Sequence, residues 1–163
     1  MQRLLRAVLA CLFAFLCAGC SLGFGKPMTS GGTTGITPEP AMTEGSGWKV
    51  AWYRAGDPDA PRILYLHGTP GSASDYEAYL LDPLPGRESV AADRVGFGRS
   101  EAGPDKHGAL VSFEQQAVEL APLLVERGGA GTLIVGHSLG GPIALRLAAD
   151  YPDRVAGVVV LAG

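Results

Sequence analysis

The sequence predicts an α/β fold, with a mostly parallel β-sheet and helices on both faces. Two observations support this fold class. Nearly continuous apolar runs, typical of strands buried on both faces, occur at residues 62–68, 132–138 and 154–163. Between and around them lie stretches in which apolar residues recur at helical spacing. Alternation of strand and helix is typical of a sheet built with right-handed crossovers.

Five strands are expected along the chain. The first, WKVAWYRAG at residues 48–56, is a candidate edge strand. A short apolar run at 62–68 and a weaker strand pattern at 88–96 follow it. The runs at 132–138 and 154–163 complete the set.

Two helices are expected between these strands. Pro122 lies inside the first and should kink or shorten it. Pro142 fits the first turn of the second helix, and Pro152 fits just beyond its end. The apolar stripe of the first helix consists of Phe113, Ala117, Leu120 and Leu124, and that of the second of Ile143, Ala144, Leu147 and Ala148.

Composition limits the class of partner. The 163 residues are 47% hydrophobic and 18% charged, as expected of a chain that is mostly globular. The net charge is −3, and no basic run or basic patch with interleaved aromatic residues is present in the sequence. Nucleic acid is therefore not an expected partner.

Residues 1–19 are expected to be an export signal of lipoprotein type. Arg3 and Arg6 precede an uncharged apolar stretch, and small residues follow it. The Leu-Cys-Ala-Gly that precedes Cys20 resembles the lipobox of bacterial lipoproteins, in which the cysteine is lipidated and becomes the new N-terminus. Ordinary cleavage with secretion, to the periplasm or beyond, and a retained membrane anchor are the alternatives. Ser21, in place of the aspartate associated with inner-membrane retention, favours the outer membrane in a host with two membranes.

Residues 20–47 are expected to tether a globular domain, residues 48–163, to the membrane. Eighteen of the 27 residues from 21 to 47 are Gly, Pro, Ser or Thr, a composition that cannot bury enough apolar surface to order itself. A flexible coil of this length has an end-to-end distance of roughly 30 Å. The alternative is that part of the segment lies along the domain. All three cysteines lie at or before Cys20, so the domain holds no disulfide.

Residues 136–140 read Gly-His-Ser-Leu-Gly, between a predicted strand and a predicted helix. In this context the turn is so sharp that Ser138 is expected to take a strained backbone conformation, with its hydroxyl at the helix N-terminus. Gly136 and Gly140 would let strand and helix approach closely. Ser138 is therefore the candidate nucleophile. The alternative is a glycine-rich turn that does not require serine.

Acyl transfer also needs two backbone N–H groups directed at the developing oxyanion. Leu139, directly after the candidate nucleophile, would supply one of them. The other would come from the loop at residues 67–72, which follows the apolar Ile-Leu-Tyr-Leu run, where Pro70 has no N–H and Thr69 is the candidate. The alternative is a plain turn. His67 is expected to hydrogen-bond locally and shape this loop.

The sequence contains three characteristic blocks, namely His67-Gly68-x-Pro70, Asp93-Arg94-x-Gly96-x-Gly98-x-Ser100 and Gly136-His137-Ser138-Leu139-Gly140-Gly141. Taken together, these blocks resemble the α/β-hydrolase family. They most resemble its branch of small esterases, peroxidase-like hydrolases and proline-iminopeptidase-like enzymes, over about residues 48–163. The resemblance implies an acyl substrate, no metal or organic cofactor, and a structural role for Asp93 and Arg94 in shaping the loop after a strand.

A serine nucleophile needs a histidine that is itself oriented by a carboxylate. In this family both follow the serine in the chain, the acid before the histidine. After Ser138 the sequence offers Asp150 and Asp153, which read as helix-end and loop carboxylates, and no histidine. His137 is expected to pack beside its strand, and His107 to be a solvated loop residue.

The triad acid and histidine are thus expected outside this sequence. The chain is predicted to be the N-terminal part of a membrane-tethered serine hydrolase that acts on an ester or related acyl bond, from a partial sequence or an interrupted gene. The alternative is a non-catalytic, hydrolase-like lipoprotein binding module or an inactive remnant. Absent C-terminal strands would leave an open sheet edge at residues 158–161, which is an aggregation hazard.

Overall fold

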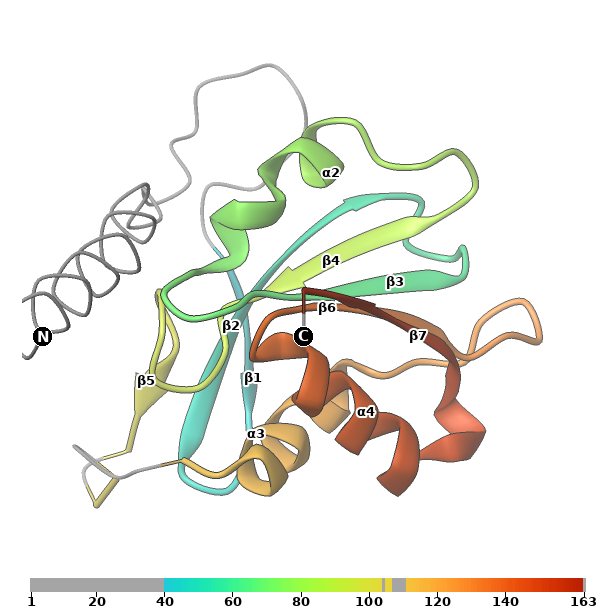
Figure 1. The fold of residues 1–163 in the computed structure, drawn as a ribbon. Helices are drawn as coiled ribbons and strands as arrows, with labels where there is room; N and C mark the ends of the chain where they lie inside the picture. Colours follow the sequence, from blue (N-terminus) through green and yellow to red (C-terminus); the bar gives the residue numbers. More distant parts are fainter. Residues whose placement is uncertain (1–39, 104, 107–110, 163) are drawn as a thin grey trace, which may run out of the picture.

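The computed structural model describes residues 40–103, 105–106 and 111–162. The predicted signal, Cys20 and most of the tether lie outside these residues, as does His107. The described part forms one mixed sheet with the strand order β1-β2-β4-β3-β6-β7, and β5 also pairs with β2 (Figure 1). Helix α2 lies on one face of the sheet and α3 and α4 lie on the other, which confirms the predicted fold class. None of the helices in these ranges has the length and apolar character needed to span a membrane.

The strands are β1 (Ala41–Glu44), β2 (Trp48–Gly56), β3 (Arg62–Leu66), β4 (Glu88–Ala92), β5 (Glu101–Ala102), β6 (Thr132–His137) and β7 (Val155–Leu161). Strands β3, β4, β6 and β7 run parallel, whereas β1, β4 and β5 each pair antiparallel with β2. The helices are α2 (Glu77–Leu81), α3 (Phe113–Leu120) and α4 (Gly140–Asp150). Short 3-10 turns occur at η1 (Ala73–Tyr76), η2 (Ala121–Leu123) and η3 (Pro152–Arg154).

The core has two layers, one on each face of the sheet. All five residues of β3 are buried, because Leu64 and Leu66 belong to the layer shared with α3 and α4, while Ile63 and Tyr65 belong to the layer under α2. This two-sided burial explains why the sequence of a central strand reads as a continuous apolar run. Ile143 and Leu147 on α4 are fully buried, as their spacing predicted.

The first predicted helix differs from expectation at its start. Ala117 and Leu120 are buried, but Phe113 is 43% exposed. Phe113 is the first residue of α3, so only the later part of the predicted stripe packs on the sheet. Pro122 shortens the helix as predicted, because the chain passes into a 3-10 turn at residues 121–123.

The start of the globular domain also requires correction. The predicted boundary was Trp48, but residues 41–44 form β1 and pair along β2. The indole Nε1 of Trp52 donates to Thr43 Oγ1 at 2.9 Å. Strand β2 is therefore not an edge strand, and the alternative that part of the tether lies along the domain holds for these four residues. A strand of four residues is too short to show the alternation by which strands are recognised from sequence.

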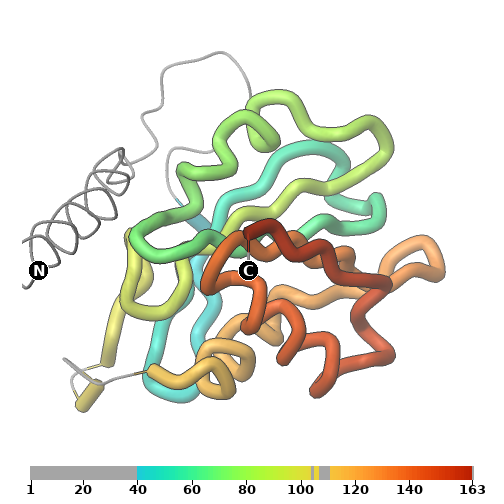
Figure 2. Tube along the Cα trace, viewed as in Figure 1, coloured from blue at the N-terminus to red at the C-terminus, as the bar shows by residue number. Residues whose placement is uncertain are grey.

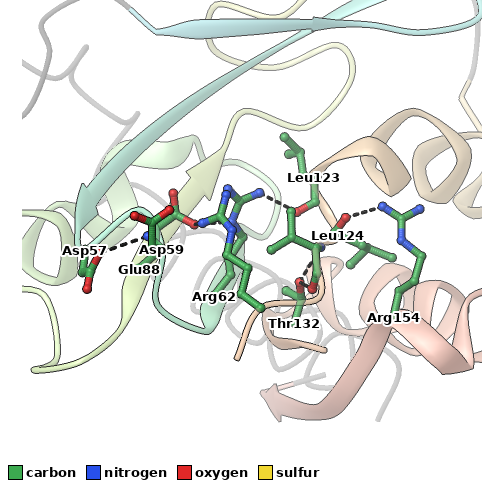
Figure 3. A network of polar contacts seen from close by, with 10 residues as sticks. Asp57, Asp59, Arg62, Glu88, Leu123, Leu124, Thr132 and Arg154 are labelled. Carbon is green, nitrogen blue, oxygen red and sulfur yellow. Dashed lines mark hydrogen bonds and ion pairs between the residues drawn. The ribbon is translucent and has the colours of Figure 1, made fainter. Parts of the chain in front are cut away.

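A buried cluster of charged side chains joins the amino ends of the central strands (Figure 3). Arg62 Nε donates to Glu88 Oε2 at 2.7 Å, and Arg62 Nη1 donates to the carbonyl of Leu123, also at 2.7 Å. Arg127 forms a second ion pair with the same oxygen of Glu88. Glu88 is fully buried, so these arginines supply its compensating charge. The cluster lies at the end of the sheet opposite Ser138.

Candidate active site

Ser138 lies in the turn between β6 and α4, with a positive φ of 48°. Such a conformation is rare and strained for a residue other than glycine. The two flanking glycines are required by close backbone contacts. A Cβ atom on Gly136 would lie 2.4 Å from the carbonyl oxygen of Gly140, and one on Gly140 would lie 2.2 Å from that of Leu66. The turn thus has the strained serine and the close approach that the sequence predicted.

The loop after β3 lies directly against this turn. Figure 2 shows the loop passing beside the start of α4, where a Cβ atom on Gly140 would meet the carbonyls of Leu66 and His67. A Cβ atom on Gly68 would lie 2.9 Å from Ser138 Cβ, so glycine allows the two segments to meet. The amide of Ser138 donates to the carbonyl of Leu161, at the end of β7, at 2.8 Å. Among the described residues, neither the Thr69 amide nor the Leu139 amide has a hydrogen-bond acceptor.

His67 is fully buried and hydrogen-bonds locally, as predicted. Its Nε2 accepts from the backbone N–H of Arg94 at 3.0 Å, so its Nδ1 carries the proton and donates to the carbonyl of Gly68 at 2.8 Å. Burial and the nearby Arg94 charge lower the pKa of His67 from 6.5 to about 4. The imidazole is therefore neutral near pH 7, and both of its nitrogens are occupied.

Arg94 contacts the loop after β3 more extensively than its own loop. Its guanidinium donates to the carbonyls of His67 and Gly68 at 2.7 and 2.8 Å, and to Thr69 Oγ1 at 2.7 Å. It also stacks over the ring of Phe97, 4.5 Å from the centroid. Burial lowers the pKa of Arg94 to about 10, so the group remains charged near pH 7. The sequence indicated a structural role for this residue but not its target.

Asp93 shapes the loop that follows β4, in agreement with prediction. Its carboxylate accepts from the backbone N–H groups of Ala73 at 2.7 Å and Arg99 at 2.8 Å. A Cβ atom on Gly98, which has a φ of +54°, would lie 2.1 Å from this carboxyl group. Gly96, with a φ of +83°, turns the chain in the same loop. Burial raises the pKa of Asp93.

The carboxylates that follow Ser138 lie away from it. Asp150 pairs with Arg146 at 2.6 Å, at the far end of α4, and Asp153 is exposed in the next turn. His137 is exposed, so the prediction that it packs beside its strand was wrong. Within the described ranges, no histidine or carboxylate hydrogen-bonds to the hydroxyl of Ser138.

Asp75 is a further acidic residue near the site, and it was not predicted from the sequence. Its Oδ2 would lie 2.4 Å from a Cβ on Gly71, and its charge interacts with those of His137 and Asp93. Burial raises the pKa of the Asp75 carboxyl, while the Ser72 backbone and His137 oppose that shift. No sequence motif marks Asp75. In the part of the chain that the structure covers, no group of three or more His, Cys, Asp or Glu residues is placed to hold a metal ion.

Comparison with known proteins agrees with this geometry. The family model described as the alpha/beta hydrolase fold matches residues 61–163. Lipase LipV of Mycobacterium tuberculosis is 38% identical over 109 residues, which cover 66% of this chain and 39% of that protein. The bifunctional esterase/perhydrolase DCH of Acinetobacter calcoaceticus is 35% identical over 122 residues, covering 74% and 43%. The sn-1-specific diacylglycerol lipase ABHD11 of Mus musculus is 34% identical over 108 residues, covering 65% and 34%.

Solved structures show the same fold. Epoxide hydrolase I of potato (Solanum tuberosum) superposes with a TM-score of 0.61 at 25% identity, covering 75% of this chain and 39% of that one. A mutant epoxide hydrolase of Vigna radiata gives a TM-score of 0.62 at 26% identity, covering 78% and 39%. The chain therefore spans well under half the length of the relatives it matches. Since the family match covers more than half of the chain, the chain belongs to the α/β-hydrolase fold family.

Proposed function

We propose that this chain carries the nucleophile and the oxyanion-binding groups of a serine hydrolase that acts on an ester or related acyl bond. The observation that supports this most directly is Ser138, strained at the start of α4 and in contact with the loop that contains Thr69. Relatives named as lipases and as an esterase/perhydrolase support the same reaction class.

In the proposed reaction, Ser138 Oγ attacks the carbonyl carbon of the substrate and forms a tetrahedral intermediate. The amides of Thr69 and Leu139 donate to its oxyanion, and the N-terminus of α4 favours the same negative charge. A histidine accepts the serine proton and returns it to the leaving group, and water then releases the acyl group. We propose that this histidine and its carboxylate partner come from sequence beyond residue 163.

The test is hydrolysis of p-nitrophenyl esters by the protein together with the natural sequence that follows residue 163. We expect multiple turnover in the wild type and its loss in Ser138→Ala, with both proteins folded by circular dichroism. A fluorophosphonate probe should label the wild type and not the variant. If the extended protein is inert on a panel of esters and amides, a non-catalytic binding module becomes the better interpretation.

The 163-residue chain alone is expected to show no enzymatic turnover. No histidine follows Ser138 in this sequence, and His67 is buried, neutral and already hydrogen-bonded through both nitrogens. Where one triad member is removed from an intact site, residual catalysis is limited to about 10³–10⁴-fold over water. Multiple turnover by this chain that disappears in Ser138→Ala would contradict the prediction and would mean that His67, His107 or His137 serves as the base.

We also propose that the protein is exported and anchored through lipid on Cys20. The proposal rests on the Ala-Gly-Cys sequence after a short apolar segment, followed by a Gly/Ser/Thr/Pro-rich stretch. More than one acyl chain is needed for stable anchoring, which a lipoprotein N-terminus provides. Mass spectrometry of the mature N-terminal peptide should show a diacylglyceryl-modified cysteine. A free thiol at Cys20 would reject the proposal.

A further inference from the structure

We propose that Arg94 is a positioning residue for the oxyanion hole, which it orients through the peptide group that joins Gly68 to Thr69. This inference rests on the proposed function, because it concerns the Thr69 amide as an oxyanion donor. It assigns Arg94 a role in the reaction that goes beyond shaping the loop after β4.

The geometry of one peptide unit carries the inference. The carbonyl of Gly68 and the N–H of Thr69 belong to the same planar trans peptide, so they point in opposite directions. Two donors hold that carbonyl: Nη2 of Arg94 at 2.8 Å and Nδ1 of His67 at 2.8 Å. Fixing the carbonyl on one side fixes the direction of the Thr69 N–H on the other.

The same contacts should make the Thr69 N–H a stronger donor. Hydrogen bonds to a carbonyl polarise its peptide group, and a charged donor does so more strongly than a neutral one. Arg94 further restrains the loop through the carbonyl of His67 and through Thr69 Oγ1. One guanidinium therefore contacts three consecutive residues of the loop.

A buried positive charge such as that of Arg94 is unusual for a residue that only holds a loop in place. The residue is only 2% exposed, and among the described residues no carboxylate pairs with its guanidinium. Asp93, its neighbour in sequence, directs its carboxylate to the amides of Ala73 and Arg99 instead. A buried cation without a counter-ion is costly, and its field favours a negative charge on the substrate side of the loop.

The test compares Arg94→Gln and Arg94→Lys with wild type in the extended, active protein. Arg94→Gln should lower kcat by roughly tenfold to a hundredfold, less than the ~10²–10³-fold loss from removing an oxyanion donor itself. KM should change little, because the contact acts on the transition state. Arg94→Lys should retain part of kcat, because lysine keeps the positive charge. It should not retain all of kcat, because lysine lacks the planar set of N–H donors that the guanidinium offers.

Arg146→Gln is the matched control, since Arg146 lies on the solvent side of α4 and pairs with Asp150. It should leave kcat and KM unchanged. A readout independent of turnover is the backbone amide proton shift of Thr69, which should move upfield in Arg94→Gln and stay unchanged in Arg146→Gln. If Arg94→Gln does not fold, Arg94→Lys provides both measurements.

The outcomes separate the two proposals. A folded Arg94→Gln with wild-type kcat, or with a raised KM and unchanged kcat, would overturn the inference and leave the proposed function intact. Absence of Ser138-dependent turnover in the wild type would overturn the proposed function. In that case an unchanged Thr69 amide shift in Arg94→Gln would overturn the inference as well.

Discussion

At the scale of single residues, His67, which begins the loop after β3, links the stability of the folded protein to pH. Its pKa is lowered to about 4 in the folded protein, against 6.5 for an unperturbed histidine. Between these values the unfolded chain binds a proton that the folded protein excludes. The contribution of neutral His67 is therefore fully present above about pH 6.5 and is lost as the pH falls toward 4.

We predict that the free energy of unfolding falls over this window by up to roughly 3 kcal/mol through His67. The measurement is urea denaturation of wild type and His67→Asn at several pH values from 7 to 4.5. The variant should be the less stable protein at pH 7, and the difference should shrink toward pH 4.5. Comparison of the two proteins at each pH cancels the contributions of Asp75 and Asp93, whose raised pKa values act in the opposite direction. A difference that does not vary with pH would reject the prediction.

The glycines around Ser138 should not tolerate a methyl group. In Gly136→Ala and Gly140→Ala the new Cβ would lie within 2.4 Å of a backbone carbonyl oxygen, which cannot move aside as a flexible side chain could. We expect each to lower the free energy of unfolding by about 3 kcal/mol or more. Gly157→Ala is the control, because its Cβ would meet only Leu133 Cδ1 at an ordinary 3.5 Å. Equal urea midpoints for all three variants would show that the turn relaxes easily.

Some of these features of single residues could be predicted from the sequence, and others could not. The strained Ser138 and its two close glycines could be predicted because they follow from a local strand-turn-helix pattern. The contacts of Arg94 with residues 67–69 could not, since they join loops about 26 positions apart. Neither hydrophobic periodicity nor motif spacing says which way a buried guanidinium turns. Asp75 was missed for the same reason.

At the scale of elements, the cluster of Arg62, Glu88 and Arg127 ties β3 and β4 to the segment before β6. Arg62→Met would leave Glu88, which is fully buried, with Arg127 as its only partner in the described residues. One of its oxygens, Oε1, already has no hydrogen-bond partner there. We predict a loss of about 3–5 kcal/mol, the usual cost of breaking a buried ion pair.

A second substitution distinguishes charge from packing at this cluster. Arg62→Met combined with Glu88→Leu should be more stable than Arg62→Met alone, because the double variant no longer holds a buried carboxylate that has lost one of its two arginine partners. Arg127 is partly exposed and can turn toward solvent. Arg146→Met, at an exposed pair, should barely move the midpoint of urea denaturation. A double variant less stable than the single one would show that Glu88 contributes through packing.

Element prediction succeeded where periodicity was long and failed where it was short. The strands β3, β6 and β7 and the helix α4 form where the patterns predicted them. The expectation that the last strand is buried on both faces was wrong, because no residue of β7 is buried. Strand β1 has four residues and strand β5 has two, too few to show an alternation. Both are held by pairing with β2, a tertiary contact that composition does not reveal.

At the scale of the whole molecule, the sheet ends on one side at β7. Within the described residues β7 pairs only with β6, so its other edge presents unpaired backbone groups. Val159, Val160 and Leu161 are each at least 40% exposed. A parallel strand with an open edge and exposed apolar side chains is a template for pairing with another chain.

We therefore predict that the 163-residue chain self-associates through β7. Its apparent mass, measured by size-exclusion chromatography with light scattering, should rise with concentration across the micromolar range. Val160→Lys should reduce this rise, because a charge on an edge strand disfavours pairing. Leu84→Lys is the matched control, since Leu84 is 51% exposed but lies in the loop between α2 and β4. If Leu84→Lys suppresses association as well as Val160→Lys does, general surface hydrophobicity rather than the β7 edge is the cause.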